Sequence, residues 1–110
     1  MNKNYNFEAA LLLLQQKDYE QLWRYALTFA KAGDSNAQCL MGLLCENGLG
    51  VLSNLQEAER WLREAAEQNN PVAWNNLGTL LLRKGENEQA KNCYQRAVEL
   101  GFTPATLLAK

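Results

Sequence analysis

The sequence predicts an all-α fold, an α/α superhelical solenoid of about three antiparallel helix hairpins followed by a short C-terminal capping helix. One observation is a repeat: residues 35–70 align with residues 71–103, and small residues match small residues in register. A second is that apolar residues recur within each block at the spacing of one helix face. A repeat of this length, made of two helical patterns, is typical of a helical-hairpin solenoid.

Capping residues indicate where the helices begin and end. Asn70-Pro71 and Thr103-Pro104 each offer an N-cap residue followed by proline at the first helical position, and Asp34-Ser35 stands at the equivalent place. Residues 53–57 contain two overlapping capping-box spacings, which predict a helix start after a glycine-rich loop. Left-handed C-terminal caps are expected at Gly33, Asn69 and Gly101.

Residues 3–34 are a degenerate first copy, because residues 17–22 align with residues 85–90. Terminal repeats drift in sequence, since one of their faces meets water and not a neighbour. The chain is therefore expected to be one repeat domain. Its predicted units are residues 3–34, 35–70 and 71–103, with the stub 104–110 as the capping helix.

Gly42 and Gly78 occupy matching interior positions in the first helix of the second and third hairpins. A glycine inside a helix costs about 1 kcal/mol relative to alanine, so close packing of the two helices must offset it. Trp61 and Trp74 are expected in the core between helices, whereas the sequence does not predict whether Trp23 is buried or exposed. Glu59–Arg63 and Arg60–Glu64 are expected to pair along a solvated face.

Composition excludes several classes of function. Eleven basic and twelve acidic residues leave a net charge of −1 and no basic run, so neither nucleic acid nor a membrane is an expected partner. Cys39, Cys45 and Cys93 cannot all pair within one chain, and no histidine is present to build a metal site or activate a thiol. We therefore expect free, mostly buried thiols, no metal, no cofactor, no catalysis and a cytoplasmic location.

Two blocks carry fixed sets of small, aromatic and leucine residues. The set in the third block is Trp74, Leu77, Gly78, Leu81, Ala90, Tyr94 and Ala97. The set in the second is Ala37, Leu40, Gly42, Gly48, Gly50, Val51, Ala58, Trp61, Ala65 and Ala66, including a G-x-G-V loop. At these positions the third block resembles a tetratricopeptide repeat and the second resembles a Sel-like repeat.

The resemblance implies a right-handed superhelix whose concave face is lined by the first helix of each hairpin and binds a protein or peptide. The partner-binding residues carried over to this face are Asn36, Cys39, Leu43, Glu46, Asn47, Asn75, Asn76, Thr79, Leu82 and Arg83. Val72 joins them, and the first copy contributes Asn4, Phe7, Glu8, Leu11 and Gln15. Since Arg83 is the only basic residue among them, binding of a C-terminal carboxylate is not expected.

The leading hypothesis is thus a non-enzymatic adaptor that binds a protein partner on its concave face. One alternative is an immunity protein that neutralises a bacterial toxin, because small Sel-like repeat proteins also occur beside toxin genes. Another is a repeat that self-associates, as a homodimer or larger stack, through its exposed end. The sequence also leaves open whether the chain is part of a longer array.

Overall fold

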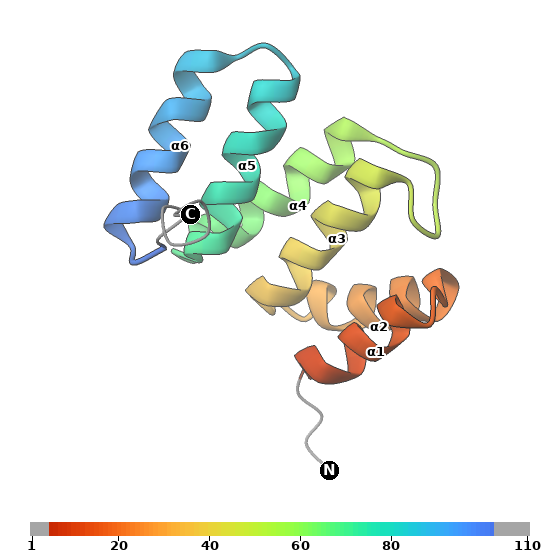
Figure 1. The fold of residues 1–110 in the computed structure, drawn as a ribbon. Coiled ribbons are helices and arrows are strands. Elements are labelled where there is room, and N and C mark those ends of the chain that lie inside the picture. Colours follow the sequence, from red (N-terminus) through yellow and green to blue (C-terminus); the bar gives the residue numbers. More distant parts are fainter. Residues whose placement is uncertain (1–4, 103–110) are drawn as a thin grey trace.

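The structure is a computed structural model that describes residues 5–102 (Figure 1). Within this range the chain is helical and contains no strand. The helices are α1 (Phe7–Gln15), α2 (Tyr19–Lys31), α3 (Ser35–Asn47), α4 (Leu55–Glu67), α5 (Pro71–Arg83) and α6 (Asn87–Glu99). The expected capping helix over residues 104–110, the Thr103-Pro104 cap and Asn4 lie outside the described residues.

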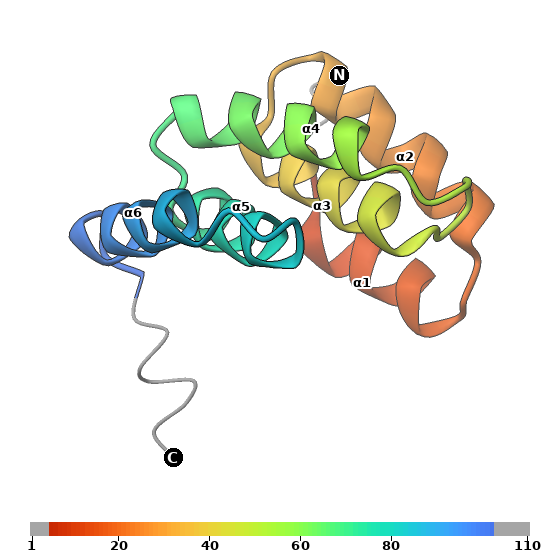
Figure 2. The same cartoon turned by 90° about the horizontal axis from the view of Figure 1, so that it is seen from above.

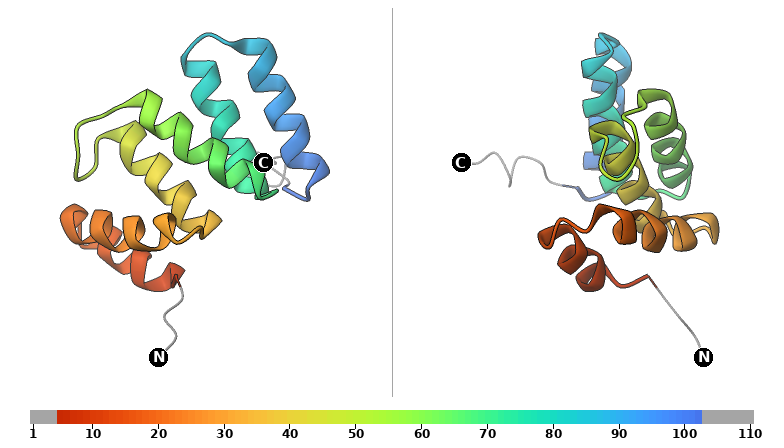
Figure 3. Two further views of the ribbon diagram at one scale, coloured as in Figure 1. Left: turned by 180° about the vertical axis from the view of Figure 1, so that it is seen from behind. Right: turned by 90° about the vertical axis from the view of Figure 1, so that its right-hand side faces the viewer.

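Consecutive helices form antiparallel pairs, α1 with α2, α3 with α4 and α5 with α6. Neighbouring pairs pack through α2 against α3 and through α4 against α5, and α3 also meets α5 directly. Seen from above, α1 and α3 lie on one side of the first two pairs, with α2 and α4 on the other (Figure 2). The view from behind accordingly presents α2 and α4 (Figure 3). The predicted all-α repeat fold is confirmed.

Side chains cap the helices at most of the predicted positions. The Asp34 carboxylate accepts a hydrogen bond from the Ala37 amide at 2.9 Å, and the Asn54 side chain accepts one from the Glu57 amide at 3.0 Å. Ser53 is not the cap of α4, because its hydroxyl donates to the carbonyl of Glu46 in the preceding helix. The positive φ angles predicted for the helix ends are present at Gly33, Asn69 and Gly101.

The core runs through all three hairpins and is built mainly from leucine and alanine, with Met41, Cys45, Trp61 and Cys93 among them. Its fully buried large side chains are Leu22, Met41, Leu44, Leu62, Leu77, Leu80 and Leu81. Trp61 is buried, as expected, while Trp74 and Trp23 are half-buried and pack against the core. Alanines carry much of the remaining contact, which lets the helices lie close together.

Gly42 shows how close the helices come. A Cβ at this position would lie 2.7 Å from Cγ of Leu62 and 2.8 Å from its Cδ2, and Leu62 is fully buried. At Gly78 the corresponding Cβ would lie 3.0 Å from Cε1 of Tyr94, a half-buried ring. Both glycines therefore do what the sequence predicted, and the contact at Gly42 is the tighter one.

We expect Gly42→Ala to lower the free energy of unfolding by about 1–2 kcal/mol, because overpacking outweighs the better helix propensity of alanine. Chemical denaturation would measure this change. Gly78→Ala is the matched control and should cost less, since the Tyr94 ring can shift toward solvent. Adding Leu62→Ala to Gly42→Ala should show favourable coupling in a double-mutant cycle; additive losses would contradict the steric explanation.

The loop between α3 and α4 folds back against the start of α2. Gly50 has a φ of +82°, and a Cβ there would lie 2.7 Å from the Tyr19 carbonyl oxygen. The loop is held at its far end by the Asn54 amide, which donates to the Cys45 carbonyl at 2.8 Å. This longer loop, which distinguishes the second block from the third, thus packs the second hairpin against the first.

Candidate partner-binding groove between α3 and α5

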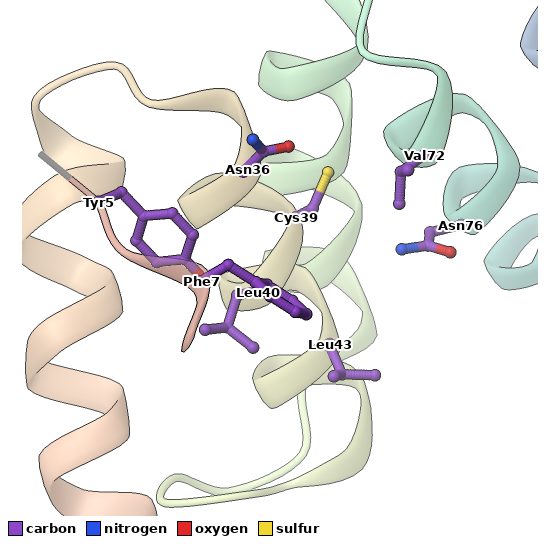
Figure 4. A pocket seen from close by; sticks show the side chains of 8 residues that line it. All are labelled: Tyr5, Phe7, Asn36, Cys39, Leu40, Leu43, Val72 and Asn76. Carbon is purple, nitrogen blue, oxygen red and sulfur yellow. The ribbon is translucent and has the colours of Figure 1, made fainter. Parts of the chain in front are cut away.

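Two adjoining hollows lie along α3 and α5 and together form what we call the α3–α5 groove. The larger one, of about 340 Å³, is shown in Figure 4 and is lined by Tyr5, Phe7, Asn36, Cys39, Leu40, Leu43, Val72 and Asn76. The smaller one, of about 180 Å³, is lined by Leu43, Glu46, Asn47, Leu62, Asn76 and Thr79. Leu43 and Asn76 belong to both hollows, so the groove is continuous.

The wall on the α1 side is aromatic. The Tyr5 ring packs against Tyr25 and Phe29, with ring centroids 5.8 Å and 6.0 Å away. Burial is the main cause that raises the pKa of the Tyr5 phenol to about 12, so this wall stays uncharged at neutral pH. Phe7, the first residue of α1, extends over Leu40 toward Leu43 and remains 66% exposed (Figure 4). A large exposed ring beside a hollow is a ready contact for a partner.

Cys39 forms part of the floor, where its sulfur faces the space between α3 and α5 (Figure 4). The residue is buried, and desolvation, with a smaller contribution from the Asp34 carboxylate, raises the pKa of its thiol to about 12. Burial likewise raises the pKa of the Cys45 and Cys93 thiols, and all three cysteines are free. A protonated thiol is a poor nucleophile, so Cys39 acts as a small apolar surface.

An amide bridge holds the helix starts of α3 and α5 together at one end of the groove. The Asn70 side chain accepts hydrogen bonds from the amides of Val72 and Ala73, which caps α5. The same side chain donates from Nδ2 to Ser35 Oγ and to Asn36 Oδ1, both at 2.9 Å. One buried asparagine therefore sets both the start of α5 and its spacing from α3.

An ion pair joins the same two helices at the other end. Arg83 Nη1 lies 2.6 Å from Glu46 Oε2, and the Glu46 side chain is only 12% exposed. The two residues stand in neighbouring repeats. With the amide bridge, this contact fixes the width of the α3–α5 groove.

The structure brings most of the predicted site residues together. Those that line the groove are Asn36, Cys39, Leu43, Glu46, Asn47, Asn76 and Thr79, along with Phe7 and Val72. Asn75, Leu82 and Arg83 lie outside the lining, as do Glu8, Leu11 and Gln15. Tyr5, Leu40 and Leu62 line it without having been predicted. Leu40 belongs to the set of repeat residues in the second block, Leu62 packs beneath Gly42 in the core, and Tyr5 lies in the first copy just before α1.

A separate surface, between α4 and the end of α5, is polar, and its charged side chains pair with one another. A hollow there is lined by Gln56, Glu59, Arg60, Arg63 and Lys84. The Glu59 carboxylate forms ion pairs with Lys84 at 2.7 Å and with Arg63 at 2.8 Å. The hydrogen bond from Lys84 is the main cause that lowers the pKa of Glu59. The expected Glu59–Arg63 and Arg60–Glu64 pairs are both present. Arg60 also lies over the Trp61 ring, at 4.9 Å.

Two further features of the described residues bear on function. Within residues 5–102, no group of three or more His, Cys, Asp or Glu side chains is arranged to hold a metal ion. None of the helices in that range is long and apolar enough to cross a membrane.

The fold defines a helical-hairpin repeat protein with a hollowed surface between neighbouring repeats. Residues 35–70 match the family model of the Sel1 repeat, and residues 71–101 match that of the tetratricopeptide repeat. The solved structure of a Sel1 repeat protein from Oxalobacter formigenes is similar, with a TM-score of 0.78 and 32% sequence identity. That similarity covers 94% of this chain and 44% of the other. The chain belongs to the Sel1-like and tetratricopeptide repeat family.

Several curated proteins contain a similar stretch. Cilia- and flagella-associated protein 70 of Macaca fascicularis and of Homo sapiens are each 32% identical over an alignment of 106 residues that covers 91% of this chain. The chitin synthase regulator SKT5 of Malassezia restricta is 38% identical over 69 residues, or 62% of this chain. The chain spans only 10%, 9% and 5% of these three proteins.

Repeats of these two kinds are generally protein–protein interaction modules without catalytic activity of their own. The activities named for the longer relatives therefore belong to those proteins.

Proposed function

We propose that this protein is a non-enzymatic adaptor that holds a protein partner in the α3–α5 groove, on the concave face of the solenoid. The observation that supports this most is the groove itself, a continuous hollow lined by residues from α1, α3 and α5. A surface shared by three hairpins exists only when the repeats are stacked, so the fold and the binding site form together.

The groove is suited to binding because it is preorganised. The Asn70 amide bridge and the Glu46–Arg83 ion pair hold α3 and α5 at a fixed spacing without a ligand. A rigid site loses little conformational entropy on binding, so a modest buried area can give useful affinity. Within residues 5–102 the side-chain amide of Asn76 makes no hydrogen bond and faces the groove, so its Nδ2 donor and its Oδ1 acceptor are available to a partner's backbone.

Leu43→Glu is expected to weaken partner binding by at least about tenfold, because a carboxylate at the junction of the two hollows would lose hydration when a partner covers it. Leu43 is 40% exposed, so the substitution should leave the fold intact. Leu52→Glu is the matched control, since Leu52 is 91% exposed in the loop after α3. Affinity capture from source-cell lysate would identify the partner, and calorimetry would give its Kd for each variant.

The outcome separates the hypotheses. A partner lost with Leu43→Glu and retained with Leu52→Glu supports the adaptor proposal, and a toxin as that partner would make the protein an immunity protein. A partner that binds both variants equally would contradict the α3–α5 groove as the site. A homodimer disrupted only by Leu43→Glu would show that the groove serves self-association.

A further inference from the structure

We propose that the occupant of the α3–α5 groove is an uncharged, extended peptide segment that inserts one aromatic or large aliphatic side chain into the larger hollow. This inference rests on the proposed function and specifies the chemistry of the partner. The side chain would enter between Phe7 of α1 and Asn76 of α5, above the floor made by Cys39 (Figure 4).

The lining of the larger hollow carries no charged side chain. Its walls are formed by Tyr5, Phe7, Leu40, Leu43 and Val72, and the uncharged thiol of Cys39 forms part of its floor. A charged side chain placed there would lose its hydration and find no counter-ion. The volume of about 340 Å³ is near the lower limit for ligand pockets, which suits one large side chain and not a whole helix.

Two carboxylates lie near the hollow. Asp34, whose charge contributes to the raised pKa of Tyr5 and Cys39, caps α3 by accepting a hydrogen bond from the Ala37 backbone amide at 2.9 Å. Glu46 lines the adjoining hollow, where Arg83 neutralises it at 2.6 Å. A charged residue of the partner would therefore compete with a short charge-assisted hydrogen bond. An acidic side chain would also be repelled by Asp34, and the lining of the larger hollow itself carries no charge, so uncharged segments are the ones that the groove complements best.

The polar groups of the groove indicate an extended segment. Asn76 presents an amide in the centre, and Asn36, Asn47 and Thr79 contribute further polar side chains along α3 and α5. An α-helix satisfies its own backbone groups and would cover the Asn76 amide without giving it a partner. An extended chain offers free N–H and C=O groups to that amide.

The test is a selection of randomised peptides displayed on phage against the immobilised intact protein. Val72→Trp would fill the larger hollow from its rim, where Val72 is 40% exposed. Val98→Trp on α6 is the matched control, since Val98 is 53% exposed and lies outside the groove. Thermal unfolding of both variants would confirm that they fold.

Selected peptides should be uncharged around one shared aromatic or aliphatic position. Their binding should fall at least about tenfold with Val72→Trp, or when that position is changed to alanine, and stay unchanged with Val98→Trp. Charged peptides blocked by Val72→Trp would overturn this inference and leave the adaptor proposal standing. The absence of any selected peptide would overturn this inference alone, because a folded partner could still occupy the groove. Peptides insensitive to both Val72→Trp and Leu43→Glu would count against the groove as the binding site in both proposals.

A second copy of the chain is the remaining occupant to test. Self-association that is measured by sedimentation and abolished by Val72→Trp would overturn the peptide inference, because the groove would then be filled by another protomer.

Discussion

Gly50→Ala is expected to lower the free energy of unfolding by about 3 kcal/mol, with a fall in Tm of more than about 10 °C. Two costs combine at this position. The backbone has a φ of +82°, where an L-residue with a side chain is strained. The new Cβ would also lie 2.7 Å from the carbonyl oxygen of Tyr19, so the loop or the start of α2 must move. Denaturant titration and thermal unfolding would measure the loss.

Gly85→Ala is the matched control for this prediction. Gly85 has nearly the same φ, +83°, but apart from its own chain neighbours no heavy atom lies within 4 Å of the position that its Cβ would occupy. It should therefore cost only the conformational penalty, about 1 kcal/mol. Equal losses at the two positions would show that the loop does not need its contact with α2.

Asn70→Ala is expected to lower the free energy of unfolding by about 3 kcal/mol, which is more than the removal of a helix cap usually costs. The substitution leaves the amides of Val72 and Ala73 without acceptors, and Ala73 is fully buried. It also removes the donor that joins α5 to Ser35 and Asn36. Chemical denaturation would give the size of the loss.

Two variants separate the two roles of Asn70. Asn54→Ala removes a single exposed cap bond at α4 and should cost about 1 kcal/mol. Asn70→Asp keeps the cap acceptor but has no Nδ2 to donate. Its loss of unfolding free energy should therefore fall between those of Asn54→Ala and Asn70→Ala. An Asn70→Ala loss no larger than that of Asn54→Ala would contradict a stabilising amide bridge between the repeats.

Most of the fold was predictable because its signals are local. Helix periodicity and caps such as Asp34 and Asn70 depend on a few consecutive residues, and the structure confirms them. Lys17 illustrates a limit, because it has a φ of 59° where the third hairpin has Gly85, and no residue preference indicates this. The choice of Asn54 over Ser53 as the cap of α4 was equally beyond the sequence pattern, since both residues fit a capping box.

The groove was predictable in part, through the register of the repeats. The register predicts that Asn36, Cys39 and Asn76 share one face, and all three line the larger hollow. It does not include Tyr5, which reaches the groove from the segment before α1. Nor does it indicate that Arg83 is engaged by Glu46, because a contact between neighbouring repeats depends on how α3 and α5 are spaced in three dimensions.

The shortness of α1 has a consequence for the energetics of recognition. This helix buries a single residue, Ala10, yet it carries Phe7, one wall of the larger hollow. Local unfolding of an element with so little buried surface costs far less than global unfolding. We therefore expect α1 to open locally more readily than α3 and α5, whose spacing is held by the Asn70 bridge and the Glu46–Arg83 ion pair. A ligand that contacts Phe7 would oppose this opening, so part of its binding free energy would go into ordering α1.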